Sequence, residues 1–186
     1  MQTSMIVAIV GIAIVAALVV AWVYFRNKRS QDLKRQFGNE YYRALDKTGS
    51  RSRAEAELVS RAKRVEHLEI RPLSAGDHDR FAERWRVTQA AFVDRPASAV
   101  SDAAKLVVEV MRARGYPVGD FDQRAADLSV DHPRFVENYR EAHALALASE
   151  RGEASTENLR QAMVHYRALF EELLEARRPE FELSHQ

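Results

Sequence analysis

The chain of 186 residues contains no cysteine. Disulfide bonds, thiolate metal sites and a cysteine nucleophile are therefore excluded for the whole sequence. The glycine-rich loops that cradle phosphates, G-x-x-x-x-G-K-[ST] and G-x-G-x-x-G, do not occur, and neither does the nucleophile motif G-x-S-x-G. The sequence thus lacks the usual signals of nucleotide binding and of nucleophilic catalysis. We expect no catalytic residue, no cofactor and no enzymatic activity.

Charge is missing from residues 5–25, a continuous apolar run. A helix of this length reaches about 30 Å, the thickness of a bilayer's hydrocarbon core. The run ends in W-V-Y-F, and such aromatic side chains suit the membrane interface. A cleaved signal peptide is the alternative, but it needs basic residues before a shorter run of roughly 7–15 residues. The pattern predicts a transmembrane helix over 5–25, with the lipid bilayer as a partner.

A basic cluster follows the apolar run and contains a single acid, Asp32. Its members are Arg26, Lys28, Arg29, Lys34 and Arg35. Basic flanks stay on the cytoplasmic side during insertion. We therefore expect a single-pass protein of a bacterial inner (plasma) membrane, with the N-terminus outside and the C-terminal domain in the cytoplasm. The same cations suit anionic lipid head groups. The reverse insertion, which would place the domain outside the cytoplasm, is the alternative.

The remaining charge is nearly balanced but unevenly distributed. Residues 36–115 hold 15 basic and 12 acidic side chains, whereas residues 116–186 hold 8 basic and 14 acidic ones. A nucleic-acid partner would require a basic face across the domain. We therefore expect no binding of nucleic acid.

Strand-like alternation is lacking, and amphipathic helix patterns separated by glycine and proline recur instead. The segments expected to be helical are 33–45, 51–67, 74–92, 96–114, a short one from 120, 131–151 and 155–177. Their short connections favour antiparallel packing. The predicted fold is all-α, with one N-terminal transmembrane helix followed by a soluble multi-helix bundle. Its parts are the transmembrane helix 5–25, a basic juxtamembrane segment and helical neck 26–69, the bundle 70–179 and a disordered tail 180–186.

Histidine and tyrosine supply the candidate interaction residues, Tyr116, Asp131, His132, Tyr139 and His143. On a helix beginning at Asp131, residues 132, 139 and 143 would share nearly one face. A metal or proton-transfer site built from the two histidines and Asp131 is one interpretation, although the spacing matches no known ligand motif. The simpler interpretation is structural. It has Asp131 and His132 capping the helix, His143 and His165 half-buried, and Trp85 in the core.

Several strings resemble a group of bacterial membrane or secreted proteins that have no assigned activity. They are F-G-N-E-Y-Y-R-A at 37–44, R-A-E-A-E-L at 53–58, I-R-P-L at 70–73, F-A-E-R-W at 81–85, R-G-Y-P-V at 114–118 and D-L-S-V-D-H-P at 127–133. The resemblance implies no catalytic residue or cofactor. In layout alone, the chain is similar to LemA-type proteins, which have an outside N-terminus, one span and a cytoplasmic helical bundle.

These observations together favour a membrane-anchored cytoplasmic interaction or scaffold module that binds another protein and performs no catalysis. The oligomeric state stays open. The alternative is a membrane-tethered enzyme or small-ligand-binding bundle whose pocket lies near Tyr116, His132, Tyr139 and His143.

Overall fold

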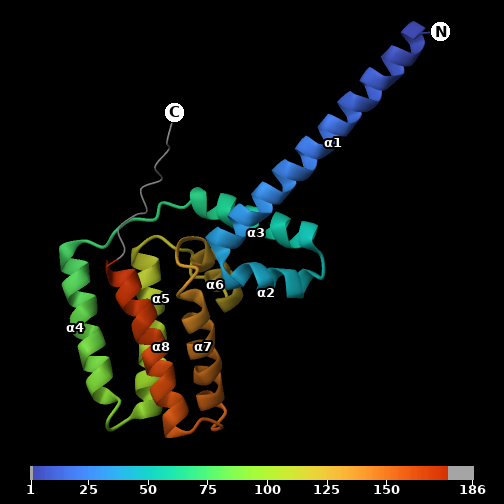
Figure 1. Ribbon diagram of the computed structural model, residues 1–186. Helices are drawn as coiled ribbons and strands as arrows, with labels where there is room; N and C mark the ends of the chain where they lie inside the picture. The colour runs from blue at the N-terminus through green and yellow to red at the C-terminus, as the bar shows by residue number, and fades with distance from the viewer. Residues whose placement is uncertain (1, 176–186) are drawn as a thin grey trace. The chain divides into compact units, whose positions relative to one another are not determined.

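The computed structural model describes the backbone of residues 2–175 and the side chains of residues 14–175. Within this part of the chain there are eight helices and no strand, which confirms the all-α prediction (Figure 1). The helices are α1 (Gln2–Phe37), α2 (Asn39–Thr48), α3 (Arg51–Glu66), α4 (Ala75–Ala91), α5 (Pro96–Ala113), α6 (Phe121–Asp131), α7 (Val136–Glu150) and α8 (Thr156–Glu175). The predicted tail 180–186 and the last residues of the predicted bundle, 176–179, lie outside the described residues. Two compact units divide the chain inside α3, between Leu58 and Val59.

The first unit contains α1, α2 and the first half of α3. Gly38, with φ of +51°, separates α1 from α2, so the helix expected over 33–45 is divided at this residue. Tyr41 is buried, and its hydroxyl lies 3.1 Å from Ser30 Oγ and donates to Glu55 Oε1 at 3.0 Å. Phe37 is buried as well. Contacts among three helical segments therefore hold this unit together.

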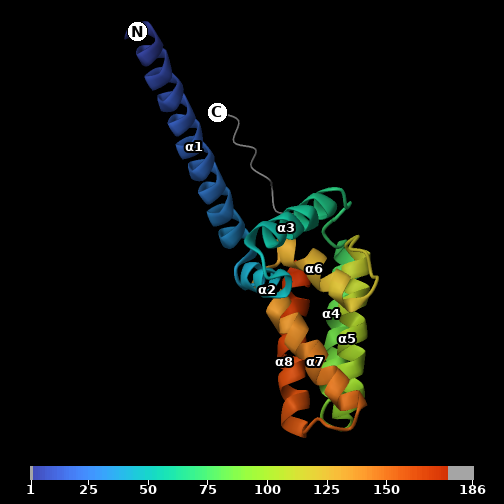
Figure 2. The ribbon, with the colours of Figure 1, turned by 90° about the vertical axis from the view of Figure 1, so that its right-hand side faces the viewer.

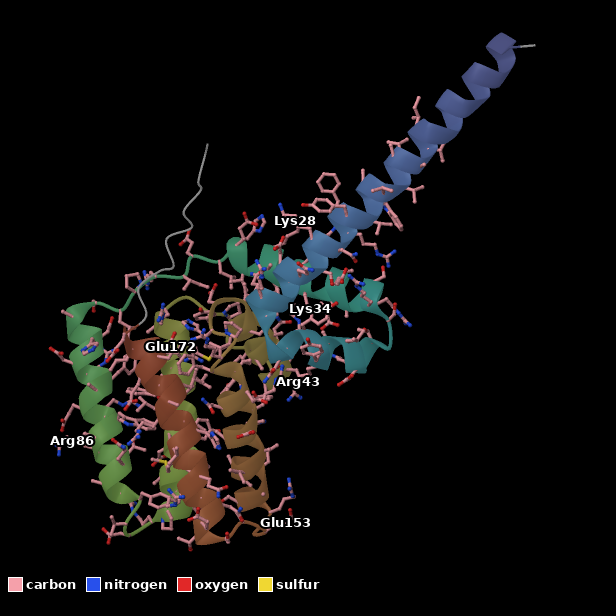
Figure 3. All side chains as sticks on the ribbon, viewed as in Figure 1. Lys28, Lys34, Arg43, Arg86, Glu153 and Glu172 are labelled. Carbon is pink, nitrogen blue, oxygen red and sulfur yellow. The ribbon has the colours of Figure 1, made fainter. Side chains whose placement is uncertain are left out.

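The basic cluster lies on the second half of α1, where all five cations are exposed. Figure 3 shows Lys28 and Lys34 projecting from this helix. The Arg26 guanidinium lies 5.2 Å from the centroid of the Trp22 ring. The apolar run 5–25 begins among residues whose side chains are not described. Among the residues that are, no helix combines the length and the apolar character that crossing a membrane requires.

The second unit is built on four helices, α4, α5, α7 and α8, which run side by side in both views (Figures 1 and 2). Helix α8 packs against each of the other three. Trp85 of α4 stacks on Phe170 of α8 with ring centroids 4.6 Å apart and planes 15° from parallel. Both side chains are buried, which confirms the prediction that Trp85 belongs to the core. The predicted helical bundle is therefore present.

Local signals explain the starts of α4, α5 and α6. Ser74 Oγ accepts the Asp77 N–H at 3.1 Å, Asp120 Oδ1 accepts the Gln123 N–H at 2.8 Å, and Pro96 is the first residue of α5. Each of these contacts satisfies or removes a backbone donor that would otherwise lack a partner in the first turn. The starts predicted from these signals are confirmed.

The predicted helix start at Asp131 is wrong. Asp131 is the last residue of α6, His132 is its C-cap, and α7 begins only at Val136. The His132 N–H still donates to Leu128 O at 2.8 Å, as expected at the end of a helix. Pro133 disfavours the helical conformation for the residue before it, and His132 accordingly has φ of −127° and ψ of 54°. The proline ends one helix rather than starting the next.

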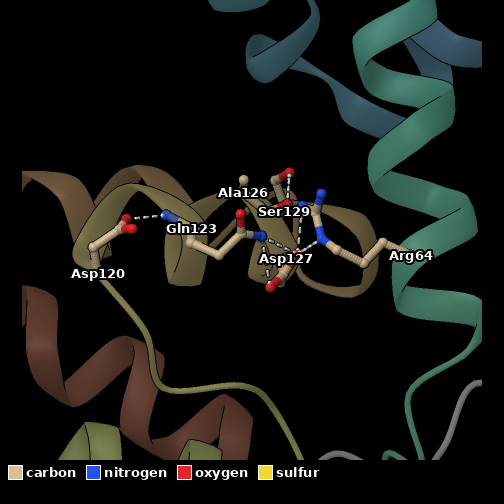
Figure 4. Close-up of polar contacts among 6 residues, drawn as sticks. All are labelled: Arg64, Asp120, Gln123, Ala126, Asp127 and Ser129. Atoms are coloured by element: carbon tan, nitrogen blue, oxygen red, sulfur yellow. Dashed lines mark hydrogen bonds and ion pairs between the residues drawn. The ribbon is translucent and has the colours of Figure 1, made fainter.

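A buried carboxylate joins the last turns of α3 to α6 (Figure 4). Asp127 is fully buried, and its Oδ1 lies 2.8 Å from Arg64 Nε and 2.6 Å from a terminal nitrogen of the same guanidinium. Gln123 Nε2 donates to both carboxylate oxygens, at 2.9 and 3.0 Å. A charge-assisted contact of this kind fixes the position of one helix against another.

Candidate functional site

A groove of about 680 Å³ lies between α5 and α7 in the second unit. Small and apolar side chains make up most of its walls, namely Ala97, Ser98, Val100, Ser101, Ala104 and Val108 of α5 and Ala146, Leu147 and Ser149 of α7. Leu147 is 39% exposed, although it is a large apolar residue. The volume falls within the range of roughly 300–1,000 Å³ that small-molecule sites occupy. The groove is therefore large enough for a ligand.

Polar and aromatic side chains converge at one end of this groove. Arg124 of α6 donates from Nε to the Tyr139 hydroxyl at 2.9 Å and from a terminal nitrogen to Gly119 O. Phe121 stacks on His143 with ring centroids 3.7 Å apart and planes 17° from parallel, and its centroid lies 4.8 Å from that of Tyr139. These contacts hold the guanidinium and both rings in defined positions.

Burial determines the protonation states of Tyr139 and His143 at this end of the groove. Burial raises the pKa of Tyr139, so its hydroxyl stays protonated at neutral pH. Burial and, secondly, the Arg124 charge lower the pKa of His143, so its ring is neutral at that pH. Arg124 is consequently the cation of this group, and the other two side chains offer neutral hydrogen-bonding groups.

Two acids, Glu109 and Glu150, line the groove at different positions. Glu109 of α5 forms a two-pronged ion pair with Arg84 of α4, in which a terminal guanidinium nitrogen lies 3.0 Å from Oε1. Hydrogen bonding by this guanidinium lowers the pKa of Glu109. Glu150 is seven residues beyond His143 on α7, about 10 Å along the helix axis. Arg124 itself forms no ion pair with any carboxylate among residues 14–175.

A second polar cluster, which we call the closed cluster, has its side chains hydrogen-bonded to partners within the protein. The Tyr116 hydroxyl donates to Asp131 Oδ2 at 2.8 Å, and His132 Nδ1 lies 2.8 Å from Glu172 Oε1. Arg114 is 1% exposed and donates from Nη1 to Leu173 O at 2.8 Å. Glu172 is labelled near the end of α8 in Figure 3. The cluster therefore ties the end of α5 and the α6–α7 junction to the last turns of α8.

Burial controls the charge states of this cluster. Burial lowers the pKa of His132 even though the hydrogen bond to Glu172 opposes the change. Burial also raises the pKa of Tyr116 and lowers that of Arg114. Neutral histidine and tyrosine with satisfied hydrogen bonds are the expected chemistry of a structural cluster.

The five candidate residues of the sequence analysis are divided between these two places. Tyr116, Asp131 and His132 belong to the closed cluster, whereas Tyr139 and His143 line the groove. The prediction that His132 and His143 share a helix face is wrong, because His132 caps α6 and precedes α7. Of the four side chains expected around one pocket, Tyr139 and His143 line this groove, and Tyr116 and His132 do not.

The residues of the alternative metal site are not grouped together in the described part of the chain. Its two histidines lie on different elements, and the described residues contain no group of three His, Cys, Asp or Glu side chains that could hold a metal ion. His165 is half-buried, as the structural interpretation predicts. Its Nδ1 lies 3.0 Å from Asn138 Oδ1 and its Nε2 lies 3.0 Å from Glu141 Oε2.

Sequence reasoning missed Arg124, Arg114 and Glu172. Phe121 and Arg124 are three residues apart on a helix whose start was predicted, and this spacing places both on one face. That signal was available in the sequence. Glu172 is forty residues from His132, and no local pattern connects the two.

Comparisons with models of protein families, with curated proteins and with solved structures find no match to this chain.

Proposed function

We propose that this protein is a single-pass membrane protein whose helical bundle acts as an interaction module for another protein, without catalytic activity. One observation carries the proposal, namely that the uncharged run 5–25 and the basic cluster that follows it belong to the same continuous helix, α1. A continuous helix satisfies its backbone hydrogen bonds internally, as a lipid environment requires. Basic residues directly after such a run favour a cytoplasmic location for the bundle.

Extraction and topology experiments test the anchor and its orientation. The full chain should stay in the membrane pellet after alkaline carbonate washing. A fluorescent protein fused after Gln186 should be bright, and a periplasmic phosphatase fused there should be inactive. Replacing Arg26, Lys28 and Arg29 by glutamate should increase the phosphatase signal, because these cations set the orientation. Recovery of the unaltered chain in the carbonate supernatant would refute the anchor, and an active phosphatase would refute the orientation.

A protein partner can be sought with the same membranes. Chemical cross-linking of the full chain, followed by mass spectrometry, should yield cross-links between exposed residues of the second unit and a second protein. Lys105 is exposed at the groove and provides a reactive amine there. Cross-links that occur only within this chain would count against an interaction module.

A second candidate function is the binding of a small ligand by the membrane-tethered bundle. The groove between α5 and α7 favours it, because concave sites with apolar walls and a few placed polar groups are typical of ligand sites. The polar lining includes Arg124, Tyr139 and His143, and the charged side chains of Lys105, Glu109, Arg112 and Glu150 line the groove as well. Binding of a ligand and binding of a protein are compatible in one bundle.

A further inference from the structure

We propose that the groove between α5 and α7 binds an anionic amphiphile, which is a molecule with one apolar chain that ends in a carboxylate or a phosphate. This inference deepens the second candidate function and rests on it. It also uses the proposed membrane anchor, since a bilayer is a source of such molecules.

The anionic end is assigned by Arg124. Its guanidinium is half-buried and held by the Tyr139 hydroxyl and by Gly119 O, yet none of the described carboxylates forms an ion pair with it. Guanidinium groups have five N–H donors in a planar fork that matches a carboxylate or a phosphate. Two bonds to neutral oxygens leave donors and the positive charge for an anion. A cation that is already positioned loses little conformational freedom on binding.

Neutral neighbours complete this end of the groove. His143 is stacked on Phe121 and Tyr139 is engaged with Arg124, so neither adds a negative charge beside the guanidinium. The lining acid Glu109 is occupied by its ion pair with Arg84. The carboxylates of Glu150 and Asp122 act electrostatically on His143, but neither forms an ion pair with Arg124, so an anion placed there meets an unpaired guanidinium.

The apolar chain is assigned by the rest of the groove. Ala104 and Val108 of α5 and Ala146 and Leu147 of α7 line it. Covering the partly exposed Leu147 side chain would remove apolar surface from water, at about 25 cal/mol per Å². Glu150 lies toward the other end, about 10 Å along α7 from His143, and would repel an anion placed there. Lys105 and Arg112 of α5 also line the groove but are exposed, whereas Arg124 is half-buried, so the head is placed at Arg124 with the chain running toward Glu150.

A helix from a partner protein is the competing occupant. The groove volume favours the amphiphile, because it lies in the small-molecule range, and the half-buried Arg124 without a carboxylate partner matches a single anionic head.

Photolabelling of the full chain tests the inference. The protein is placed in nanodiscs of phosphatidylcholine and irradiated with a long-chain carboxylate that carries a diazirine in its chain, and the labelled peptides are identified by mass spectrometry. Peptides from α5 and α7 should be labelled. An unlabelled carboxylate of equal length should compete, an alkyl phosphate should reveal whether the phosphate head is also accepted, and the alcohol of equal length should not compete.

Two variants and a control locate the site. Arg124→Gln should lower groove labelling about tenfold or more, because it removes a charge-assisted contact. Leu147→Asp should lower it comparably, because it puts a negative charge on the apolar wall at an exposed position that folding tolerates. Arg86→Gln is the matched control. Arg86 projects from α4 and pairs with Glu83, so its loss should leave labelling unchanged (Figure 3).

The results distinguish this inference from the anchor. Labelling of 5–25 without labelling of α5 and α7 overturns the groove site while supporting the anchor. Labelling of α5 and α7 without labelling of 5–25 supports the groove site and overturns the anchor. Equal competition by the alcohol, or unchanged labelling in the Arg124→Gln protein, overturns the assignment of an anionic head. Protection of α5 and α7 by a cross-linked protein, with no carboxylate labelling, would assign the groove to a partner helix instead.

Discussion

The buried carboxylate of Asp127 should be one of the strongest single contributions to the stability of the second unit. Replacing Asp127 by alanine removes the acceptor for the Arg64 guanidinium and for the Gln123 amide at once. Hydrogen bonds to charged groups each contribute about 1.5–3 kcal/mol. The Arg64 side chain is 39% exposed, so water can solvate its charge after the change and the full cost of a stranded buried ion does not apply. We therefore expect a loss of about 3 kcal/mol.

Urea unfolding of the full chain in a non-ionic detergent measures this loss. Urea is uncharged and, unlike guanidinium chloride, does not screen the ion pair. Fluorescence of Trp85 reports the core of the second unit once Trp22 is replaced by phenylalanine. Asp127→Asn should cost less than Asp127→Ala, because the amide retains one oxygen acceptor.

Asp102→Ala provides the matched control for this prediction. Asp102 is an exposed acid whose oxygen lies 3.6 Å from Lys105 Nζ, and exposed ion pairs contribute roughly 0–1 kcal/mol. If Asp127→Ala costs no more than Asp102→Ala, the buried ion pair does not hold α3 to α6 and the reasoning is refuted.

Three further predictions concern the same unit and the same unfolding assay. Phe170→Ala should cost about 3–5 kcal/mol, because it empties the core beside Trp85. Gly115→Ala should cost more than Gly152→Ala; both glycines have positive φ, but only at Gly115 would a Cβ meet a backbone oxygen, at 2.5 Å. Burial lowers the pKa of His132 below 6.5 in the folded state. Its contribution to the free energy of unfolding is therefore complete above about pH 6.5 and is lost as the pH falls through the folded-state pKa. In the His132→Gln protein, the free energy of unfolding should depend less on pH in this acidic range.

Helix positions followed from the sequence wherever the deciding contact is local. The caps at Ser74 and Asp120 act over three residues, and Pro96 acts on its own turn, so each start was predictable. The start of α7 was not predictable from the sequence. A proline is found both just after the end of a helix and in its first turn, so Pro133 alone does not distinguish the two. Pro133 was interpreted as an early helical residue, whereas the restriction it imposes on His132 ends α6.

The candidate site was predictable only in part for a related reason. Sequence periodicity indicates which residues share a helix face, and it does not indicate which faces meet. Arg114 shows the limit, since a charged residue is expected at the surface, yet this one is buried and donates to a carbonyl 59 residues away. Tyr116 and Asp131 were both named as candidates, and the hydrogen bond between them came from tertiary packing.

A pair of tyrosine variants separates the structural cluster from the proposed site. Tyr116→Phe removes the donor to Asp131, and the loss should cost about 1–2 kcal/mol of unfolding free energy while groove photolabelling stays unchanged. Tyr139→Phe removes the acceptor for Arg124 Nε, so the guanidinium keeps only its hydrogen bond to Gly119 O and is held less firmly at the groove. Its larger effect should be on photolabelling, because a cation that must be ordered on binding binds more weakly. Both substitutions delete one buried hydroxyl from the same bundle, so each serves as the other's control. Weaker labelling in the Tyr116→Phe protein, or unchanged labelling in the Tyr139→Phe protein, would mean that the division between closed cluster and open groove does not separate structure from binding.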